Sequence, residues 1–332
     1  MKPFAYTKAS SALSAIQIVE REAAAKFLAG STNLVDLMRE GAENPARLVD
    51  INRLDFNKIE EIGGAVRLGA TAKNAATANH LLVKQRFPLL TQAILAGASG
   101  QLRNAATNGG NLLQRTRCQY FYDVHQPCNK RTPGTGCGAI AGFNRIHAIF
   151  GWSQNCIATY PGDMANALYA LDATVQVQGA SGTRQIPIGE FHWLPGDAPH
   201  VDTTLKRDEL ITAIDLPAAS AKFAARSYYL KVRERASYAF ALVSAAVALE
   251  VENNRIRDVR IVLGSVAHKP WRAKETEQEL IGKPADESNF RRAANIALRD
   301  ARAFEHNGYK IEMSKRVVAR ALQNALEGGK QA

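Results

Sequence analysis

The sequence predicts an α+β protein of more than one domain. Its 332 residues, 46% of them hydrophobic, can bury more than one core. Alternating polar and apolar residues, which are typical of strands, occur at 173–179, 183–188 and 209–216. Residues 286–326 instead carry apolar residues at helical spacing. A chain that contains both patterns is expected to combine sheets with helices.

A short segment at 217–222, PAASAK, resembles a linker. We therefore expect a first domain at 1–220 and a second domain, an antiparallel sheet with helices, at 221–332. No apolar run approaches the length that crosses a bilayer, so we expect no membrane span. The first residues show no continuous apolar core and no twin arginine, so we expect no export signal there.

The formal net charge of +11 could serve nucleic acid, an anionic cofactor or an acidic protein partner. The basic residues do not form one long run, and the chain has no RNP, KH or zinc-finger signature. We therefore expect no nucleic-acid binding.

The stretch 97–113, GASGQLRNAATNGGNLL, is typical of a loop that brings backbone against a ligand. Gly109 and Gly110 lack a Cβ, so we expect the chain to turn there through positive φ and to approach the ligand closely. Thr107 and Asn111 add short polar side chains beside the exposed amides. Such N–H groups suit an anion such as a pyrophosphate, although an ordinary Gly-Asn turn has the same composition.

A second candidate phosphate site is KFLAGSTNLVDLM at 26–38. The pattern predicts a strand, a polar turn and a helix, with Ser31, Thr32 or Asn33 as the N-cap. The free amides at the start of a helix suit a phosphate. The turn lacks G-x-G-x-x-G and the chain has no P-loop motif, so a Rossmann dinucleotide fold is not expected.

All four cysteines, Cys118, Cys128, Cys137 and Cys156, fall in one stretch of the chain. Two disulfides would require an oxidising compartment. Zinc sites usually show C-x2-4-C pairs, and the intervals here are longer. An iron–sulfur cluster needs four thiolates and tolerates long spacings when a folded loop supplies them. The spacing alone leaves these three possibilities, and free thiols, open.

The composition around the cysteines favours a metal or a cluster. Between residues 103 and 147 there are six Lys or Arg residues against one acid, Asp123. Nearby cations and amides would stabilise deprotonated cysteine ligands. Residues 131–142, RTPGTGCGAIAG, are glycine-rich and are expected to be loop, to which a bound cluster or metal would give order.

Five motifs then occur in the order expected of one known family. They are KFLAGSTNL at 26–34, GATAKN at 69–74, QLRNAATNGGNLL at 101–113, PGDMANAL at 161–168 and YYLKVRERASYA at 228–239. In these motifs the chain resembles the FAD subunit of molybdenum hydroxylases, the xanthine dehydrogenase and carbon monoxide dehydrogenase family. Residues 115–137, RTRCQYFYDVHQPCNKRTPGTGC, are similar to the insert of the FAD and [4Fe-4S] subunit of bacterial periplasmic aldehyde oxidoreductases.

The resemblance implies a fold and a second cofactor. The first domain would be a vanillyl-alcohol-oxidase-type (PCMH) FAD-binding domain with a cysteine-bearing loop insert at 114–157. The second would be a small α+β domain of the CO dehydrogenase flavoprotein C-terminal type. The four cysteines would hold a [4Fe-4S] cluster, either as a relay for electrons or as a structural staple. No catalytic acid, base or nucleophile is implied on this chain.

The resemblance also assigns residues to FAD. Those expected to wrap the pyrophosphate are Lys26, Phe27, Leu28, Ala29, Gly30, Ser31, Thr32, Asn33 and Leu34. Those expected along the flavin and its ribitol or ribose are Ala98, Thr107, Gly110, Asn111 and Asp163. Ile211 would pack against the cofactor, and Lys231 would reach the isoalloxazine from the second domain. Asn33 stands where NAD-using relatives have a glutamate, which argues against NAD as the acceptor.

The expected function follows from the same resemblance. An aldehyde would be oxidised at a molybdenum site on another subunit of a heterotrimer. Electrons would pass through [2Fe-2S] centres on a third subunit to FAD on this chain, and from there to an external acceptor. Two other functions stay open: a stand-alone flavin oxidase or reductase, and a zinc-stapled binding protein without redox work.

The location is an expectation of the same kind. The similar complexes are periplasmic, so the chain is expected to take its cofactors in the cytoplasm and to be exported docked to a partner with a twin-arginine signal. Residence in the cytoplasm is the alternative.

Overall fold

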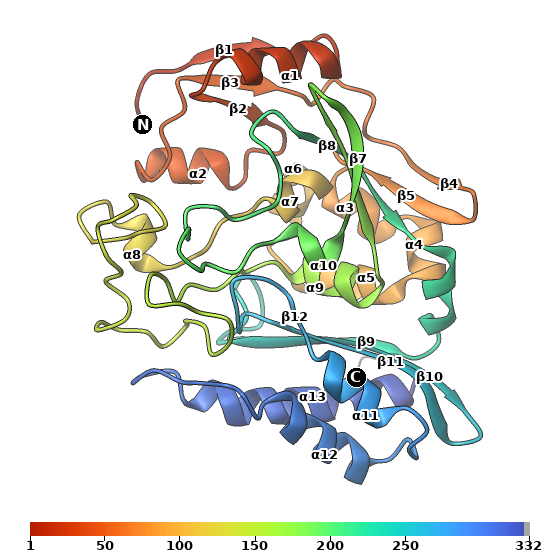
Figure 1. Ribbon diagram of the computed structural model, residues 1–332. Helices are drawn as coiled ribbons and strands as arrows, with labels where there is room; N and C mark the ends of the chain where they lie inside the picture. The colour runs from red at the N-terminus through yellow and green to blue at the C-terminus, as the bar shows by residue number, and fades with distance from the viewer. Residues whose placement is uncertain (329–332) are drawn as a thin grey trace.

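The structure is a computed structural model that describes residues 1–328. Three sheets follow one another along the chain, and each is covered by its own helices (Figure 1). This arrangement confirms the predicted α+β class. No helix in the described residues is both long enough and apolar enough to cross a membrane.

The N-terminal unit is a small parallel sheet of order β1–β3–β2. Its elements are β1 (Ala5–Lys8), α1 (Ala12–Arg21), β2 (Ala25–Leu28), α2 (Leu34–Arg39) and β3 (Arg47–Asp50). Ser11 begins α1 with a capping box to Ser14, and the helix buries Ile16 and Val19 in the core of this unit. The predicted strand, turn and helix at 26–38 are therefore β2, the turn after it and α2.

The central unit is a five-stranded antiparallel sheet of order β4–β5–β8–β6–β7. The strands are β4 (Ile59–Ile62), β5 (Ala65–Gly69), β6 (Thr174–Gly179), β7 (Gly182–Pro187) and β8 (Leu210–Leu216). The last three confirm the strands predicted from alternation. The helices of this unit are α3 (Asn74–Asn79), α4 (Leu81–Arg86), α5 (Pro88–Ala96), α6 (Gly100–Ala105), α7 (Asn108–Leu112), α9 (Asp163–Ala170) and α10 (Ile188–Phe191).

The cysteine-bearing insert runs between α7 and α9 and contains one helix, α8 (Gln119–Tyr122), among its described residues. It is joined to the C-terminal unit by backbone hydrogen bonds. The amide of Ile149 donates to the carbonyl of Val266, and the amide of Tyr160 donates to that of Ala267, both at 2.9 Å. Hydrogen bonds to the C-terminal unit therefore help to hold the insert, which has little regular secondary structure of its own.

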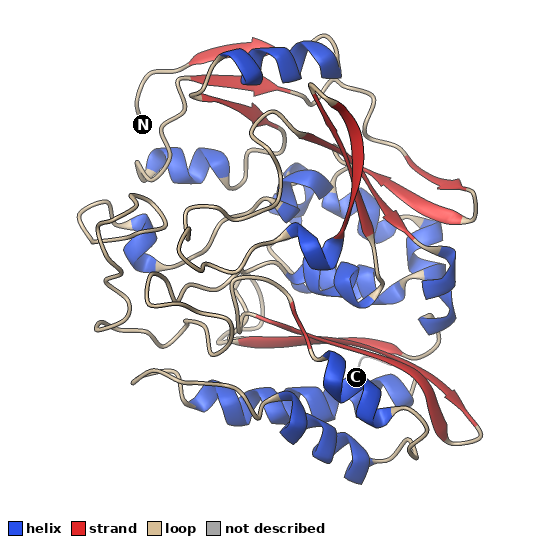
Figure 2. Ribbon diagram, in the orientation of Figure 1, coloured by secondary structure: helices blue, strands red, loops and turns tan. Residues whose placement is uncertain are grey.

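The C-terminal unit follows the predicted linker, which forms the short 3-10 helix η1 (Ala218–Phe223). Its antiparallel sheet has the order β12–β11–β10–β9. The elements are β9 (Ser227–Val232), β10 (Val243–Glu252), β11 (Arg255–Gly264), β12 (Trp271–Arg272), α11 (Lys274–Leu280), α12 (Glu287–Ala297) and α13 (Tyr309–Leu326). The helices of this unit lie below the sheet in Figure 2, and α5 and α9 of the central unit pack against it from above.

Candidate functional site

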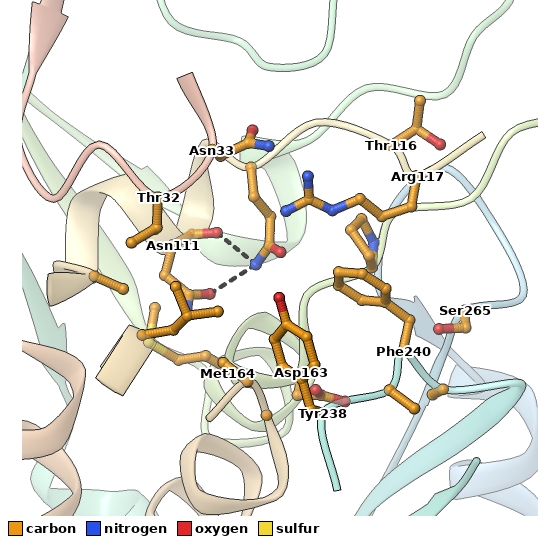
Figure 3. A pocket seen from close by; sticks show the side chains of 18 of the residues that line it. Thr32, Asn33, Asn111, Thr116, Arg117, Asp163, Met164, Tyr238, Phe240 and Ser265 are labelled. Carbon is orange, nitrogen blue, oxygen red and sulfur yellow. Dashed lines mark hydrogen bonds between the residues drawn. The ribbon is translucent and has the colours of Figure 1, made fainter. Parts of the chain in front are cut away.

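A cavity of about 1030 Å³ lies where the three units and the insert meet. Many of the residues predicted to bind FAD line it: Ser31, Thr32, Asn33, Ala98, Gly110, Asn111, Asp163 and Lys231. Figure 3 shows Thr32, Asn33 and Asn111 on one side of the cavity and Arg117, Phe240 and Ser265 on the other. The structure thus brings together motifs that are separated by as much as two hundred positions in the sequence, from Ser31 to Lys231.

The other predicted residues are not among those that line the cavity: Lys26, Phe27, Leu28, Ala29, Gly30, Leu34, Thr107 and Ile211. The ammonium of Lys26 is 2.5 Å from Glu43. A Cβ on Gly30 would lie 2.5 Å from the carbonyl oxygen of Ala105, so this glycine allows the turn after β2 to contact the α6–α7 connection. Ile211 is buried in the core, against Gly109.

The stretch 97–113 is not the loop that its composition predicts, because α6 and α7 occupy most of it. Gly109 and Gly110 lie inside α7, and neither has positive φ. Thr107 caps α7 by accepting the Gly110 amide at 3.3 Å, and a Cβ on Gly110 would lie 2.9 Å from that hydroxyl. The glycine is therefore required by close packing at the cap, not by an unusual backbone angle. Positive φ occurs instead at Ser31 (60°) and Ala98 (51°), both in the cavity wall.

Of the three predicted N-cap candidates, Asn33 occupies the N-cap position of α2, but its side chain makes no capping hydrogen bond. Its Oδ1 instead accepts the backbone amide of Arg115 at 2.9 Å, which joins the turn to the start of the insert. Its Nδ2 is buried and has no hydrogen-bond partner within residues 1–328, while other atoms of the residue line the cavity. An unpartnered donor in a cavity fits a ligand with acceptor oxygens, such as a pyrophosphate.

Asp163 and Lys231 form an ion pair at the opposite wall. The Lys231 ammonium is 2.8 Å from Asp163 Oδ2 and 3.1 Å from the carbonyl of Ala96. Tyr229 donates to the second carboxylate oxygen at 2.5 Å, and burial together with the Asp163 charge raises the Tyr229 pKa well above its usual value. Asp163 begins α9 and Lys231 belongs to β9, so the pair joins the central and C-terminal units at the cavity.

Most of the lining residues were not predicted as ligands, and Arg117 is the most prominent of these. It hydrogen-bonds Tyr122, and its guanidinium carbon lies 5.0 Å from the ring centroid of Phe240. Phe240 and Tyr238 are half exposed and come from the β9–β10 connection. In the sequence, the available signal for Arg117 was its position directly before the predicted ligand Cys118. Both residues line the cavity.

The four cysteines gather in one cluster of the insert. Cys118, Cys128 and Cys156 are buried and Cys137 is half-buried, and all four are free thiols. Backbone bridges pair Cys128 with Cys137 and Ser153 with Cys156. Within residues 1–328, no three His, Cys, Asp or Glu side chains converge closely enough to hold a single metal ion.

The groups around the sulfurs are donors that suit thiolates. Burial raises the pKa of Cys118 to about 12, and the amides of Tyr120 and Phe121 act against this shift by hydrogen-bonding its sulfur. Backbone amides likewise reach Cys137 and Cys156. A buried thiolate without a cation is costly, so these donors fit cysteines that ligate iron.

Two models of protein families match the chain. The FAD binding domain in molybdopterin dehydrogenase matches residues 2–219, and the CO dehydrogenase flavoprotein C-terminal domain matches residues 228–327. The chain belongs to this family of FAD-binding subunits. As a member it is an oxidoreductase flavoprotein.

Sequence similarity to known proteins extends over almost the whole chain. The aldehyde oxidoreductase FAD-binding subunit PaoB of Escherichia coli (strain K12) is 44% identical, over 98% of this chain and 99% of that protein. The glyceraldehyde dehydrogenase medium chain of Sulfolobus acidocaldarius is 26% identical over 96% of this chain and 97% of that protein. Carbon monoxide dehydrogenase from Oligotropha carboxidovorans has the same fold, with a TM-score of 0.78 and 21% identity over 99% of this chain and 100% of that one.

Proposed function

We propose that this chain is the electron-transfer flavoprotein subunit of a molybdenum-dependent aldehyde oxidoreductase. Its 44% identity over 98% of the chain to the aldehyde oxidoreductase subunit PaoB carries the proposal. The partners would be a [2Fe-2S] subunit and a molybdenum catalytic subunit in a heterotrimer. The names of the similar proteins, which describe them as subunits or medium chains, support an assembly of this kind.

The lining residues suit the parts of FAD differently. The side-chain amide of Asn33 would hold the pyrophosphate, because its Nδ2 has no partner within residues 1–328. The turn around Ser31 and Thr32, which also lines the cavity, would add the amides that precede α2. The Asp163–Lys231 pair would orient the ribitol and the isoalloxazine. FAD supplies the electron chemistry when bound, and these residues orient it and restrict the access of water.

We further propose that Cys118, Cys128, Cys137 and Cys156 hold a [4Fe-4S] cluster. Their burial together, the amide donors at their sulfurs and the buried Lys130 near Cys156 support four thiolate ligands. Metal analysis of anaerobically purified protein should find about four iron atoms and matching sulfide per chain. Stoichiometric zinc without sulfide would refute the cluster.

The function is tested by flavin reduction. Adding an aromatic or aliphatic aldehyde to the intact complex should bleach the flavin absorbance under anaerobic conditions. The isolated FAD-loaded chain should show no bleaching, because we place the aldehyde site on another subunit. Bleaching of the isolated chain would indicate a stand-alone oxidase instead.

We also propose that the chain reaches the periplasm by co-export with a partner that bears a twin-arginine signal. A folded export route is required because the cluster must be assembled before four free cysteines meet an oxidising compartment. The test is fractionation of the native host with and without the signal-bearing subunit. A chain that stays wholly cytoplasmic in the intact complex, or that is exported alone, contradicts the proposal.

A further inference from the structure

Two histidines contact the sulfurs of the cysteine cluster, and they come from different units. His147 lies in the insert, with its Nε2 3.1 Å from Sγ of Cys118. His268 follows β11 in the C-terminal unit, with its Nε2 3.2 Å from Sγ of Cys156. Both rings are buried, at 1% and 7% exposure. The cluster is therefore contacted by side chains from both sides of the boundary between the insert and the C-terminal unit.

The other nitrogen of each ring identifies the tautomer. Nδ1 of His147 and Nδ1 of His268 are buried without a hydrogen-bond partner in the described part of the chain. A neutral imidazole carries one N–H, and buried N–H groups without an acceptor are rarer than buried acceptors without a donor. The proton therefore belongs on Nε2, where it faces sulfur, and each cysteine sulfur is the acceptor.

We propose that His147 and His268 are positioning residues that donate these hydrogen bonds to thiolate ligands of the cluster and raise its reduction potential. The inference rests on the proposed [4Fe-4S] cofactor. One added electron makes the cluster more negative, and a donor at a ligand sulfur stabilises that charge. Removal of either donor should therefore disfavour the reduced cluster.

The two histidines differ in what lies beside them. His147 and Cys118 both line the FAD cavity, whereas His268 does not. A change at His147 should therefore disturb the flavin spectrum as well as the cluster. A change at His268 should affect the cluster alone.

The test uses the intact complex and matched variants. His147→Leu and His268→Leu remove the donor, whereas His147→Gln and His268→Gln keep an N–H near the Nε2 position. His125→Leu, at an exposed histidine of the same insert, is the control. We expect redox titration followed by EPR to show a more negative cluster potential in each Leu variant, a largely restored potential in each Gln variant and no shift in the control.

Leu variants with wild-type iron content and wild-type potential would overturn the proposal. If a Leu variant loses its iron, the Gln variant decides, because recovered iron supports a donor role and absent iron refutes it. A wild-type chain without iron and sulfide would refute the cofactor itself. An iron-containing wild type with unmoved variant potentials would refute only the role of the histidines.

Discussion

Among single residues, Asn33 has two separable roles. Its Oδ1 accepts the Arg115 amide, and its Nδ2 has no hydrogen-bond partner within residues 1–328, so we expect the Nδ2 amide to donate to FAD when the cofactor is bound. Asn33→Asp keeps the acceptor but removes the donor and adds a negative charge beside the expected pyrophosphate. We expect FAD affinity to fall at least about tenfold, since a hydrogen bond to a charged group contributes roughly 1.5–3 kcal/mol.

Titration of apoprotein with FAD, followed by flavin fluorescence, measures this change. Asn79→Asp makes the same replacement at an exposed asparagine outside the cavity and is the control. Equal affinities in the two variants would mean that the Asn33 amide does not contact FAD.

Lys310 is fully buried in α13, and its ammonium donates to the carbonyls of Ile146 and His147 at 3.0 Å and of Ser265 at 2.7 Å. Burial, followed by the charge of Arg145, lowers its pKa to about 7. A lysine in the unfolded chain has a pKa of about 10.4, so between pH 7 and this value the unfolded chain binds more protons than the folded protein. The Lys310 contribution therefore makes the free energy of unfolding rise with pH across this window.

Lys310→Met tests that contribution. The variant leaves three buried carbonyls without a donor, so we expect it to be less stable than wild type by about 2 kcal/mol at pH 7. It should also lack the part of the pH dependence that Lys310 supplies. Thermal unfolding midpoints measured from neutral to alkaline pH compare the two proteins, and parallel curves would contradict a lowered Lys310 pKa.

Among the elements, α7 controls the cavity because it carries Gly110 and Asn111 in the lining. Gly110→Val places a branched side chain against the Thr107 hydroxyl, 2.9 Å from the added Cβ, and disrupts the cap. We expect the loss of the cap to lower the free energy of unfolding by about 1 kcal/mol. We also expect the variant to lose bound FAD. Gly100→Val is the matched control, since a Cβ there meets no described atom within 4 Å. Flavin content of the purified variants measures the effect, and a Gly110→Val protein with full FAD would contradict the site.

At the scale of the whole molecule, the Asp163–Lys231 pair joins two units around the cavity. Both side chains are nearly buried, at 10% and 4% exposure. Removing one partner leaves an uncompensated charge, so Asp163→Asn or Lys231→Met should each destabilise the protein by roughly 3–5 kcal/mol. The double variant should cost less than the sum of the two. A double-mutant cycle from denaturant unfolding measures the coupling, and strictly additive losses would contradict it.

Alternation at 173–179, 183–188 and 209–216 correctly predicted the strands β6, β7 and β8. Burial at every second position accounts for the alternation in β6. In β7 only Ile186 is buried, whereas most of β8 is buried, so the structure does not show the same cause in these two strands. The prediction of a glycine-rich loop at 97–113 was wrong, because the short helices α6 and α7 form most of this stretch. The glycines in this stretch allow the backbone many conformations, but packing against neighbouring segments decides which conformation it adopts.

The sequence by itself determined the family, the α+β class and eight of the residues that line the cavity, because ordered motifs carry that information locally. Only the tertiary structure decided which atoms of those residues are free. The oxygen of Asn33 accepts the amide of Arg115, far along the chain, whereas its Nδ2 has no hydrogen-bond partner within residues 1–328. His268 reaches the sulfur of Cys156 because the insert packs on the C-terminal unit. Such pairings depend on contacts between distant segments, which no local pattern encodes.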